Sequence, residues 1–380
     1  MIRATFGFDT ADTAALDLQW DILNGTWYNF STAIAPGVPG PPNSGSAGQS
    51  AEKWFGVGMF TRVFSAQTTW VVGFDWQLGN HGPNGLNQFL QLSYSGGVIL
   101  SLEMQLSGAI AVKSGGGTNG TGTTVAMTST PYLFTTTGVW LGYLELRCTG
   151  FGGAVNFSLW LNDVQILAGS AGFGINLPDR VTMGSQGSGG MQYDNVYMLD
   201  GQGVAPLNDR LGPIRITSLI PASDAAGNWI ITPSSFSYRY QAVQEPPDVG
   251  ATHYITPPLI HSIQSFSTQP SPCFGLVLGV MVNTTFRGST GSTTCDAVYV
   301  NGATVVTIGS SVVNGPFHNQ QQFLSLSPAS GTNFTDFEIS GSLWGASSAS
   351  PFLQLTQFWL EKITSLRNVP YNCGLGSYSF

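Results

Sequence analysis

The chain has 380 residues, a length typical of two domains, and only 8% of them are charged, against about 25% in ordinary soluble proteins. Helices need Glu, Lys and Arg on their exposed faces, and disordered chains are poor in aromatic residues. The 49 Gly beside 23 Phe, 12 Tyr and 10 Trp therefore exclude both classes and indicate a folded, all-β protein.

The first half of the chain contains strand-like segments separated by glycine-rich turns. Residues 1–10, MIRATFGFDT, alternate as a strand does and have no apolar signal core, so we expect synthesis in a cytoplasm without secretion. Segments 34–50 and 114–123 are rich in Gly, Pro and Ser and predict surface loops. Hairpin turns are predicted at 95–97 and 162–163. The predicted strands are 57–64, 69–76, 88–94, 97–104, 109–113, 139–148, 154–161 and 164–168.

Short strands at this spacing, almost without helical periodicity, are typical of antiparallel sandwiches. We therefore predict a first β-sandwich domain over residues 1–205. A proline-containing joint at 204–208 leads to a second β-sandwich domain over 206–380, to which we assign an assembly or interaction role. Its predicted strands are 214–219, 236–243, 253–255, 260–266, 274–283, 296–300, 303–308, 334–340 and 353–363.

Charge and hydropathy limit the partners of the chain. The net charge is −8, and the three lysines, Lys53, Lys113 and Lys362, form no basic cluster. Binding to nucleic acid or to an anionic membrane surface is therefore not expected. The longest apolar run, 273–282, is about half the roughly 20 residues that cross a bilayer, so no membrane insertion is expected.

The four cysteines, Cys148, Cys273, Cys295 and Cys373, are widely spaced and include no C-x-x-C pair. In a reducing compartment this spacing favours buried free thiols. A bridge between Cys273 and Cys295 across neighbouring strands is the alternative.

Segments 69–79, 89–105, 139–166 and 180–199 resemble, in order, the strands of concanavalin A-like, laminin-G-like sandwich domains. Trp140 opens a strand that contains Arg147, a W-L-N-D tip follows at 160–163, and an Asp194-Asn195 pair lies in the closing strand. The resemblance implies a concanavalin A-like jelly-roll β-sandwich for the first domain.

Segments 207–229, 243–255 and 343–363 resemble uncharacterised virion proteins of tailed bacteriophages. This resemblance implies a structural virion component, a capsid or tail decoration or a fibre protein, made in the cytoplasm of a bacterial host. Its partners would be copies of itself and other virion proteins. A surface of Ser, Thr, Asn, Gln and Gly is easily desolvated and suits such permanent assembly.

Lectin-like sandwiches often hold Ca²⁺ through Asp and Asn side chains, which makes Asp194, Asn195 and Asp200 candidate metal ligands. The same residues fit a structural role, in which they cap a turn beside the joint and pair with Arg180 or Arg210. The sequence favours this structural role, and no other cofactor is expected.

The acidic residues do not form the closely spaced carboxylate pair that glycoside hydrolases of this fold need. Glu103, Glu145, Glu338 and Glu361 are scattered, and we expect them on exposed strand faces. The four histidines have no zinc-site spacing. We therefore expect no enzymatic activity, and a polysaccharide depolymerase is the last of the alternatives.

Most of the tryptophans alternate with polar residues in predicted strands and should pack in the core. Trp54 and Trp229 lie in loop-like segments and are the two candidate platforms for a sugar ring. They carry the main alternative function, a module that recognises a host-surface glycan as its receptor.

Overall fold

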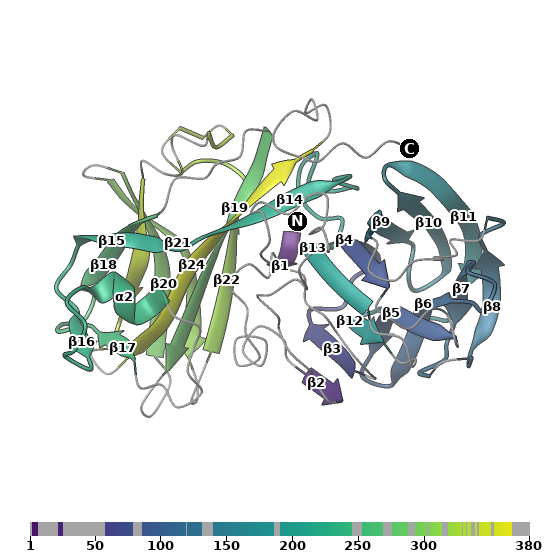
Figure 1. The fold of residues 1–380 in the computed structure, drawn as a ribbon, viewed down its shortest axis with the longest axis horizontal. Coiled ribbons are helices and arrows are strands. Elements are labelled where there is room, and N and C mark those ends of the chain that lie inside the picture. The colour runs from purple at the N-terminus through teal and green to yellow at the C-terminus, as the bar shows by residue number, and fades with distance from the viewer. Residues whose placement is uncertain are drawn as a thin grey trace. The chain divides into compact units, whose positions relative to one another are not determined.

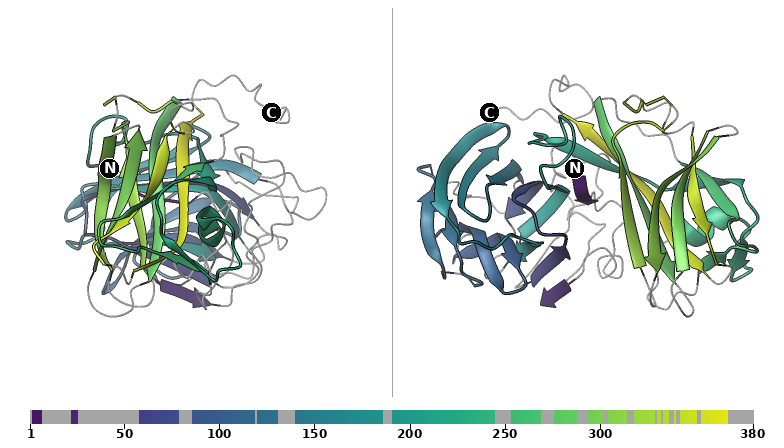
Figure 2. Two further views of the ribbon diagram at one scale, coloured as in Figure 1. Left: turned by 90° about the vertical axis from the view of Figure 1, so that its left-hand side faces the viewer. Right: turned by 180° about the vertical axis from the view of Figure 1, so that it is seen from behind.

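The computed structural model describes residues 2–6, 22–25, 58–78, 86–118, 120–130, 140–185, 191–244, 253–268, 276–287, 293–301, 304–313, 318–328, 330–331, 333–335, 339, 342–350 and 353–366. Almost all of its regular elements are antiparallel strands, which confirms the all-β prediction. The chain divides into two compact units, of which the first ends at Ile214 and the second begins at Arg215 (Figures 1 and 2).

The first unit contains two sheets. Sheet A has six strands in the order β1 (Ile2–Phe6), β13 (Met191–Leu199), β4 (Thr69–Leu78), β9 (Trp140–Thr149), β10 (Ala154–Leu161) and β11 (Val164–Gly172). Sheet B has seven strands in the order β2 (Ile22–Gly25), β3 (Gly58–Val63), β12 (Arg180–Ser185), β5 (Asn87–Tyr94), β6 (Gly97–Met104), β7 (Ile110–Ser114) and β8 (Thr123–Met127). Because the chain passes repeatedly from one sheet to the other, the unit is a jelly-roll sandwich, as predicted.

Aromatic side chains fill the space between sheets A and B. The ring of Phe74 on β4 lies 6.5 Å from that of Phe89 on β5 and 5.3 Å from that of Tyr193 on β13. The Tyr193 hydroxyl donates to the carbonyl of Phe89 (3.0 Å), so its polar end is satisfied inside the core. Trp70 and Trp76 are fully buried on the same strand, as predicted.

The hairpin between β10 and β11 shows how local sequence sets the register. Leu161 pairs with Val164, which leaves Asn162 and Asp163 as the two turn residues, with φ angles of 49° and 67°. Asn and Asp tolerate this left-handed conformation, so the predicted turn forms. Strand β8 was not predicted, because its side chains are mostly exposed and show no apolar alternation.

The second unit is also a sandwich of two sheets. Sheet C runs in the order β16 (Ile230–Thr232), β17 (Tyr254–Thr256), β24 (Gln354–Ser365), β19 (Leu276–Arg287) and β22 (His318–Leu324), with β14 (Ile214–Leu219) beside β24. Sheet D runs in the order β15 (Pro221–Ala226), β18 (Ile263–Thr268), β23 (Leu343–Ser348), β20 (Thr293–Asn301) and β21 (Thr304–Val313).

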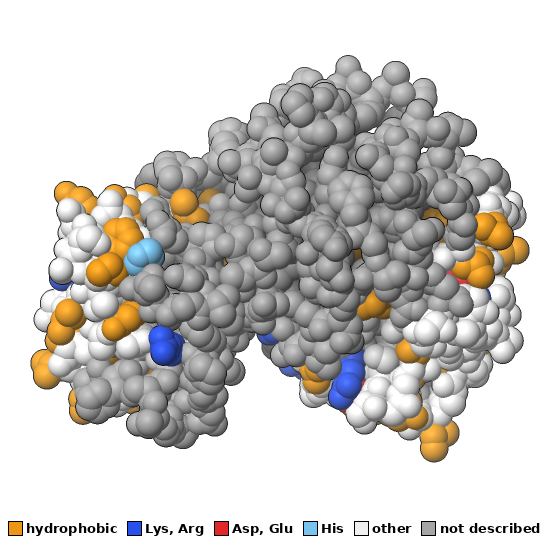
Figure 3. All heavy atoms as spheres, turned by 60° about the horizontal axis from the view of Figure 1, so that its bottom comes forward, with side chains coloured by type: hydrophobic (Ala, Val, Ile, Leu, Met, Phe, Trp, Pro, Cys, Tyr) orange, Lys and Arg blue, Asp and Glu red, His pale blue; other side chains and the backbone are white. Residues whose placement is uncertain are grey.

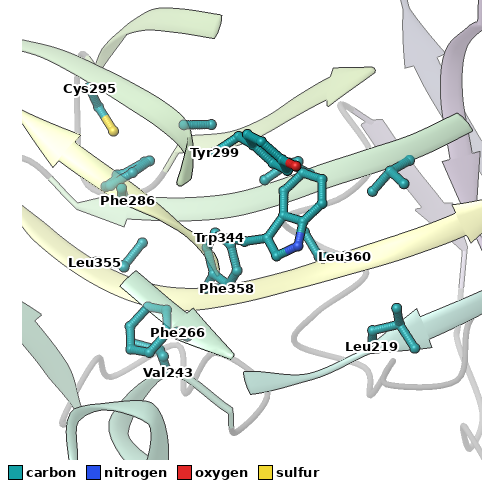
Figure 4. Packing of buried hydrophobic residues seen from close by; sticks show 14 of the residues in the cluster. Leu219, Val243, Phe266, Phe286, Cys295, Tyr299, Trp344, Leu355, Phe358 and Leu360 are labelled. Carbon is teal, nitrogen blue, oxygen red and sulfur yellow. The ribbon is translucent and has the colours of Figure 1, made fainter. Parts of the chain in front are cut away.

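One apolar cluster joins sheets C and D (Figure 4). The ring of Trp344 on β23 lies 4.9 Å from that of Tyr299 on β20, and the ring of Phe266 on β18 lies 5.5 Å from that of Phe358 on β24. The second contact crosses from one sheet to the other. The predicted second β-sandwich is therefore confirmed.

Two predicted strands of the second half are wrong. Residues 236–243 contribute to the helix α2 (Arg239–Gln244) instead. The side chain of Asp224 accepts the backbone N–H groups of Arg239 (2.9 Å) and Tyr240 (2.8 Å), and Gln241 accepts that of Tyr238 (3.2 Å). These hydrogen bonds satisfy backbone N–H groups at the first turn of the helix, which have no partner within the helix itself. The described residues of 334–340 are likewise outside any strand.

Cys148 and Cys295 are buried free thiols, as predicted. Burial raises the pKa of both thiols, so they remain protonated and unreactive at neutral pH. The alternative bridge between Cys273 and Cys295 is wrong, because Cys295 is unpaired within the core of the second unit. Cys273 and Cys373 lie outside the described residues.

Candidate functional site

A polar cluster lies on the face of sheet A opposite the aromatic core. Asp75 alternates with the core residues Phe74 and Trp76 and therefore points to this other face. Asp194 on β13 is its direct cross-strand neighbour, and both carboxylates are buried. Two adjacent buried carboxylates require strong hydrogen-bond donors close by.

Asn195 supplies such donors through an unusual backbone conformation. Its φ is +50°, and the register of β13 against β4 shifts between Asp194 and Tyr197. The Asn195 side-chain amide donates to Asp75 (2.7 Å), and its backbone N–H donates to Asp194 (2.7 Å). The Asp194-Asn195 pair therefore forms a β-bulge within a strand and not the predicted turn.

Asp200 is bound elsewhere. Its carboxylate accepts the guanidinium of Arg3 (2.5 Å) and the backbone N–H of Gln202 (2.9 Å). Burial raises the pKa of Asp200, but hydrogen bonds that include these two outweigh burial and hold the pKa below its usual value.

The candidate Ca²⁺ site at Asp194, Asn195 and Asp200 is not formed, because the side chains are bonded within the fold. No group of three His, Cys, Asp or Glu residues in the described part of the chain could hold a metal. The predicted ion pairs are also wrong, because Arg180 pairs with Asp179 (3.3 Å) and Arg210 pairs with other acids.

Arg210 belongs to a segment, residues 207–212, that we call the strap. The strap lies on the polar face of sheet A and is bonded to Glu145 on β9. One oxygen of the Glu145 carboxylate accepts the backbone N–H of Gly212 (2.9 Å) and the hydroxyl of Tyr197. The other oxygen lies 3.0 Å from the guanidinium of Arg210. A single buried carboxylate therefore binds two points of the strap.

Further contacts fix the Arg210 side chain. The guanidinium lies 3.8 Å from the ring centroid of Trp160 and also pairs with Asp163 in the β10–β11 turn. The stacking contact and the two ion pairs hold the planar group in one orientation. The expectation that Glu145 would be exposed is wrong, because only 1% of its side chain is accessible.

Two tyrosines complete the cluster as neutral donors. Burial raises the pKa of Tyr143 and of Tyr197 well above the usual value, and the nearby Glu145 carboxylate raises both further. Tyr143 donates to the carbonyl of Asn195 (3.2 Å), and the Tyr197 hydroxyl also accepts the backbone N–H of Leu211 (3.1 Å). The strap is thus part of the first unit, which extends beyond the predicted boundary at residue 205.

A second set of buried polar side chains lies on sheet B. Leu90, Leu92, Leu100 and Leu102 share one face of β5 and β6, and the opposite face carries what we call the polar layer: Gln88, Gln91, Ser101, Glu103 and Lys113. The predicted exposure of Glu103 is therefore wrong, because its carboxylate is buried beside the Lys113 ammonium (2.6 Å).

The glycine-rich segment 115–121 is bonded to the polar layer. Glu103 accepts the backbone N–H of Gly120 (2.6 Å), and Gln88 donates to the carbonyl of Gly116 (3.0 Å). Gly116 has a φ of +80°, a conformation that glycine adopts readily. A side chain at this position would also clash with the backbone of Thr121. The segment predicted as a surface loop thus supplies a donor to the buried ion pair and an acceptor to Gln88 of the polar layer.

The two candidate sugar platforms have different outcomes. Trp229 is fully buried, and its indole N–H donates to the carbonyl of Ser262 (3.3 Å) in the core of the second unit. A buried ring cannot stack on a sugar, so this prediction is wrong. Trp54 lies outside the described residues.

No protein-family model matches the chain, and no curated protein matches it. Solved structures give distant matches to β-sandwich folds of carbohydrate-binding, lectin and lyase proteins. The CBM2 module of the evolved Dit of Lactobacillus casei BL23 phage J-1 is 12% identical, with a TM-score of 0.33, over 52% of this chain and 94% of that one.

Two further matches have the same character. The cellulose induced protein Cip1 is 14% identical, with a TM-score of 0.31, over 44% of this chain and 89% of that one. The galectin LEC-6 of Caenorhabditis elegans is 12% identical, with a TM-score of 0.26, over 36% of this chain and 88% of that one. Separately, no described helix is long and apolar enough to cross a bilayer.

Replacing Arg210 by Ala leaves the Glu145 carboxylate buried without its guanidinium partner. We expect the free energy of unfolding of the first unit to fall by about 3–5 kcal/mol, measured by urea denaturation. Arg147→Ala is the matched control, because Arg147 pairs with Asp209 at 2.6 Å but both side chains are more than one-third exposed. The control should lose at most about 1 kcal/mol. Equal losses in the two variants would contradict the role of the strap.

Asp200 should make stability depend on acid pH. Its pKa is lowered in the folded state, so its contribution is present above the unfolded value near pH 4 and disappears as the pH falls through the folded value. Asp200→Asn should therefore be less stable than the wild type at pH 6, with a difference that shrinks below about pH 4. Thermal unfolding across this range measures the difference, with Asp209→Asn as the exposed control. A difference independent of pH would refute the assignment.

Proposed function

We propose that the chain is a non-enzymatic structural component of a tailed-phage virion. It serves as a capsid or tail decoration or as a fibre protein, and it acts through contacts with its own copies and with other virion proteins. The observation that carries this proposal is the placement of its few charges inside the fold.

Nine charged side chains are buried among the described residues, although the whole chain is only 8% charged. They are Asp75, Glu103, Lys113, Glu145, Asp194, Asp200, Arg215, Glu361 and Lys362. The surface therefore carries few charges, as the composition suggests, and uncharged side chains dominate its described part in Figure 3. Such a surface can be covered by another protein without leaving charges unpaired.

Large apolar side chains are exposed on both units. The most accessible are Ile175, with 85% of its surface exposed, and Val204, with 72%. Others are Leu106, Met127, Val164, Ile230, Leu259, Ile260 and Leu276. Single exposed apolar residues are normal in monomers. In combination with so few surface charges, they favour permanent contacts.

The buried carboxylates support a non-enzymatic role. Glu103 and Glu145 lie on different sheets, and each is paired with a cation, Lys113 or Arg210. Asp75 and Asp194 are adjacent but are held by hydrogen bonds from Asn195. In each case the fold itself provides the partner that a substrate or water would need to displace. The virion setting rests on the resemblance of segments 207–229, 243–255 and 343–363.

Purified particles test the proposal directly. Quantitative mass spectrometry of gradient-purified virions should find the chain at a fixed, high copy number relative to the major capsid protein, because a structural component occupies repeated positions. An abundant non-virion protein of the same lysate serves as the control and should be lost during purification. A chain that is lost with the control would refute the proposal.

The recognition of a host-surface glycan is the second candidate function, and the described residues give it less support. Trp229 is buried, and the side chains of the polar layer are buried and bonded within the fold, so neither presents a face to a sugar. We therefore expect the purified chain not to bind an array of host polysaccharides.

The two candidates give different results in these experiments. Stoichiometric incorporation into particles without glycan binding supports the structural role alone. Specific binding of a host polysaccharide by the purified chain would instead support the receptor-recognition role. Release of reducing sugar from the bound polysaccharide would instead show a depolymerase and contradict the non-enzymatic proposal.

A further inference from the structure

We propose that two copies of the chain join through strand β22 of the second unit. The two β22 strands would pair antiparallel about a twofold axis at Gln321 and extend sheet C from one copy into the next. This inference rests on the proposed function in one respect, because it requires that copies of the chain meet.

Strand β22 differs from the other edge strands of known register in that its ladder is long and unbroken. The edges β2 and β16 contain only four and three residues. Longer edges carry register shifts, and these are β1, β8, β11, β15 and β21. Short strands and bulges are the usual protection against edge-to-edge pairing. β22 pairs with β19 over seven residues, from Leu324 to His318, without a shift.

The composition of β22 permits pairing with an identical strand. Its sequence, HNQQQFL, contains no Lys, Arg, Asp, Glu or Pro. In an antiparallel pair about a twofold axis, any charge on the strand would lie close to the same charge of the second copy. A strand without such residues avoids this repulsion, and it lacks the charged or proline residues that block an edge.

Gln320 provides the observation that points to a partner. It is in register with Thr284, and Gln322 is in register with the core residue Val282, so both glutamines face the interior of the sandwich. Only 3% of Gln320 is exposed, yet neither its amide nitrogen nor its amide oxygen has a hydrogen-bond partner within the described chain. Buried amides without partners are rare and destabilising.

A twofold axis at Gln321 would satisfy this amide. It places Gln320 directly opposite Gln322 of the second copy, on the same face of the joined sheet. Each amide can donate and accept, so the symmetric arrangement forms two glutamine pairs. Gln321 lies on the opposite face of the sheet, where its side-chain amide donates to Asn283 (2.9 Å). This hydrogen bond holds the side chain at the axis position in one place. The strand is thus complementary to itself in this one register.

Cysteine cross-linking in the full chain tests the register. Under mild oxidation, Gln321→Cys should form a covalent dimer, because each copy presents this position to itself at the axis. Phe323→Cys alone should not cross-link, but a mixture of Asn319→Cys and Phe323→Cys chains should, because these positions oppose each other. Tryptic mass spectrometry identifies the bridge. The absence of a bridge at 321, or equal cross-linking by Phe323→Cys alone, overturns the proposed register.

A second variant tests the amide without depending on disulfide geometry. Gln320→Leu keeps the size of the side chain and removes the buried amide, so the monomer should remain folded in thermal unfolding. Sedimentation velocity should show a rise of at least about tenfold in the dimer dissociation constant. Ser310→Ala is the control and should not change it. An unchanged dissociation constant in Gln320→Leu, or a wild-type chain that is monomeric at all concentrations, overturns the inference.

The result is separable from the proposed function. If the chain is stoichiometric in particles but Gln321→Cys particles contain no bridge at 321, the β22 interface is refuted and the virion role stands. If the purified chain forms the bridge but is absent from particles, the interface stands and the virion role is refuted.

Discussion

The structure depends on the requirement that a charge taken out of water must find an opposite charge or several hydrogen bonds within the fold. Glu145 illustrates this requirement, because its carboxylate binds Arg210, the Gly212 N–H and the Tyr197 hydroxyl. Glu103 is satisfied in the same manner by Lys113 and the Gly120 N–H. In both cases a backbone N–H group of a segment outside the strands is one of the partners, so an internal charge helps to determine where that segment lies.

This dependence explains why the first unit includes residues beyond its last strand. A strap of uncharged residues would have only weak contacts to the outer face of a sheet. The strap instead brings Arg210 and backbone donors to a carboxylate that cannot be solvated by water. Removing either partner leaves the other buried and unpaired, which makes the contact sensitive to single substitutions. The end of the first unit is therefore set by electrostatics and not by the end of the sandwich.

The sequence predicted those features that depend on neighbouring residues in the chain. Alternation located most strands of both sandwiches, and Asn162-Asp163 located a turn, because pleat and turn conformation are local properties. It failed where a distant residue decides the outcome. Helix α2 depends on Asp224 from another element, and the burial of Glu145 depends on the strap. Trp229 follows Gly227 and Asn228, which are typical of a loop, but its side chain belongs to the apolar cluster of the second unit.

The burial of charges in the interior also affects the surface. A chain with few charges that places many of them inside must leave its surface to amides, hydroxyls and apolar groups, which do not repel a second protein. Such a surface needs another protection against unwanted association between sheet edges. Bulges hinder edge-to-edge pairing on most of these edges, namely on β1, β8, β11, β15 and β21. An edge of comparable length without a bulge, such as β22, is then informative. Where protection is systematic, its absence together with an unpaired buried amide marks the edge that the fold leaves open to its own copy.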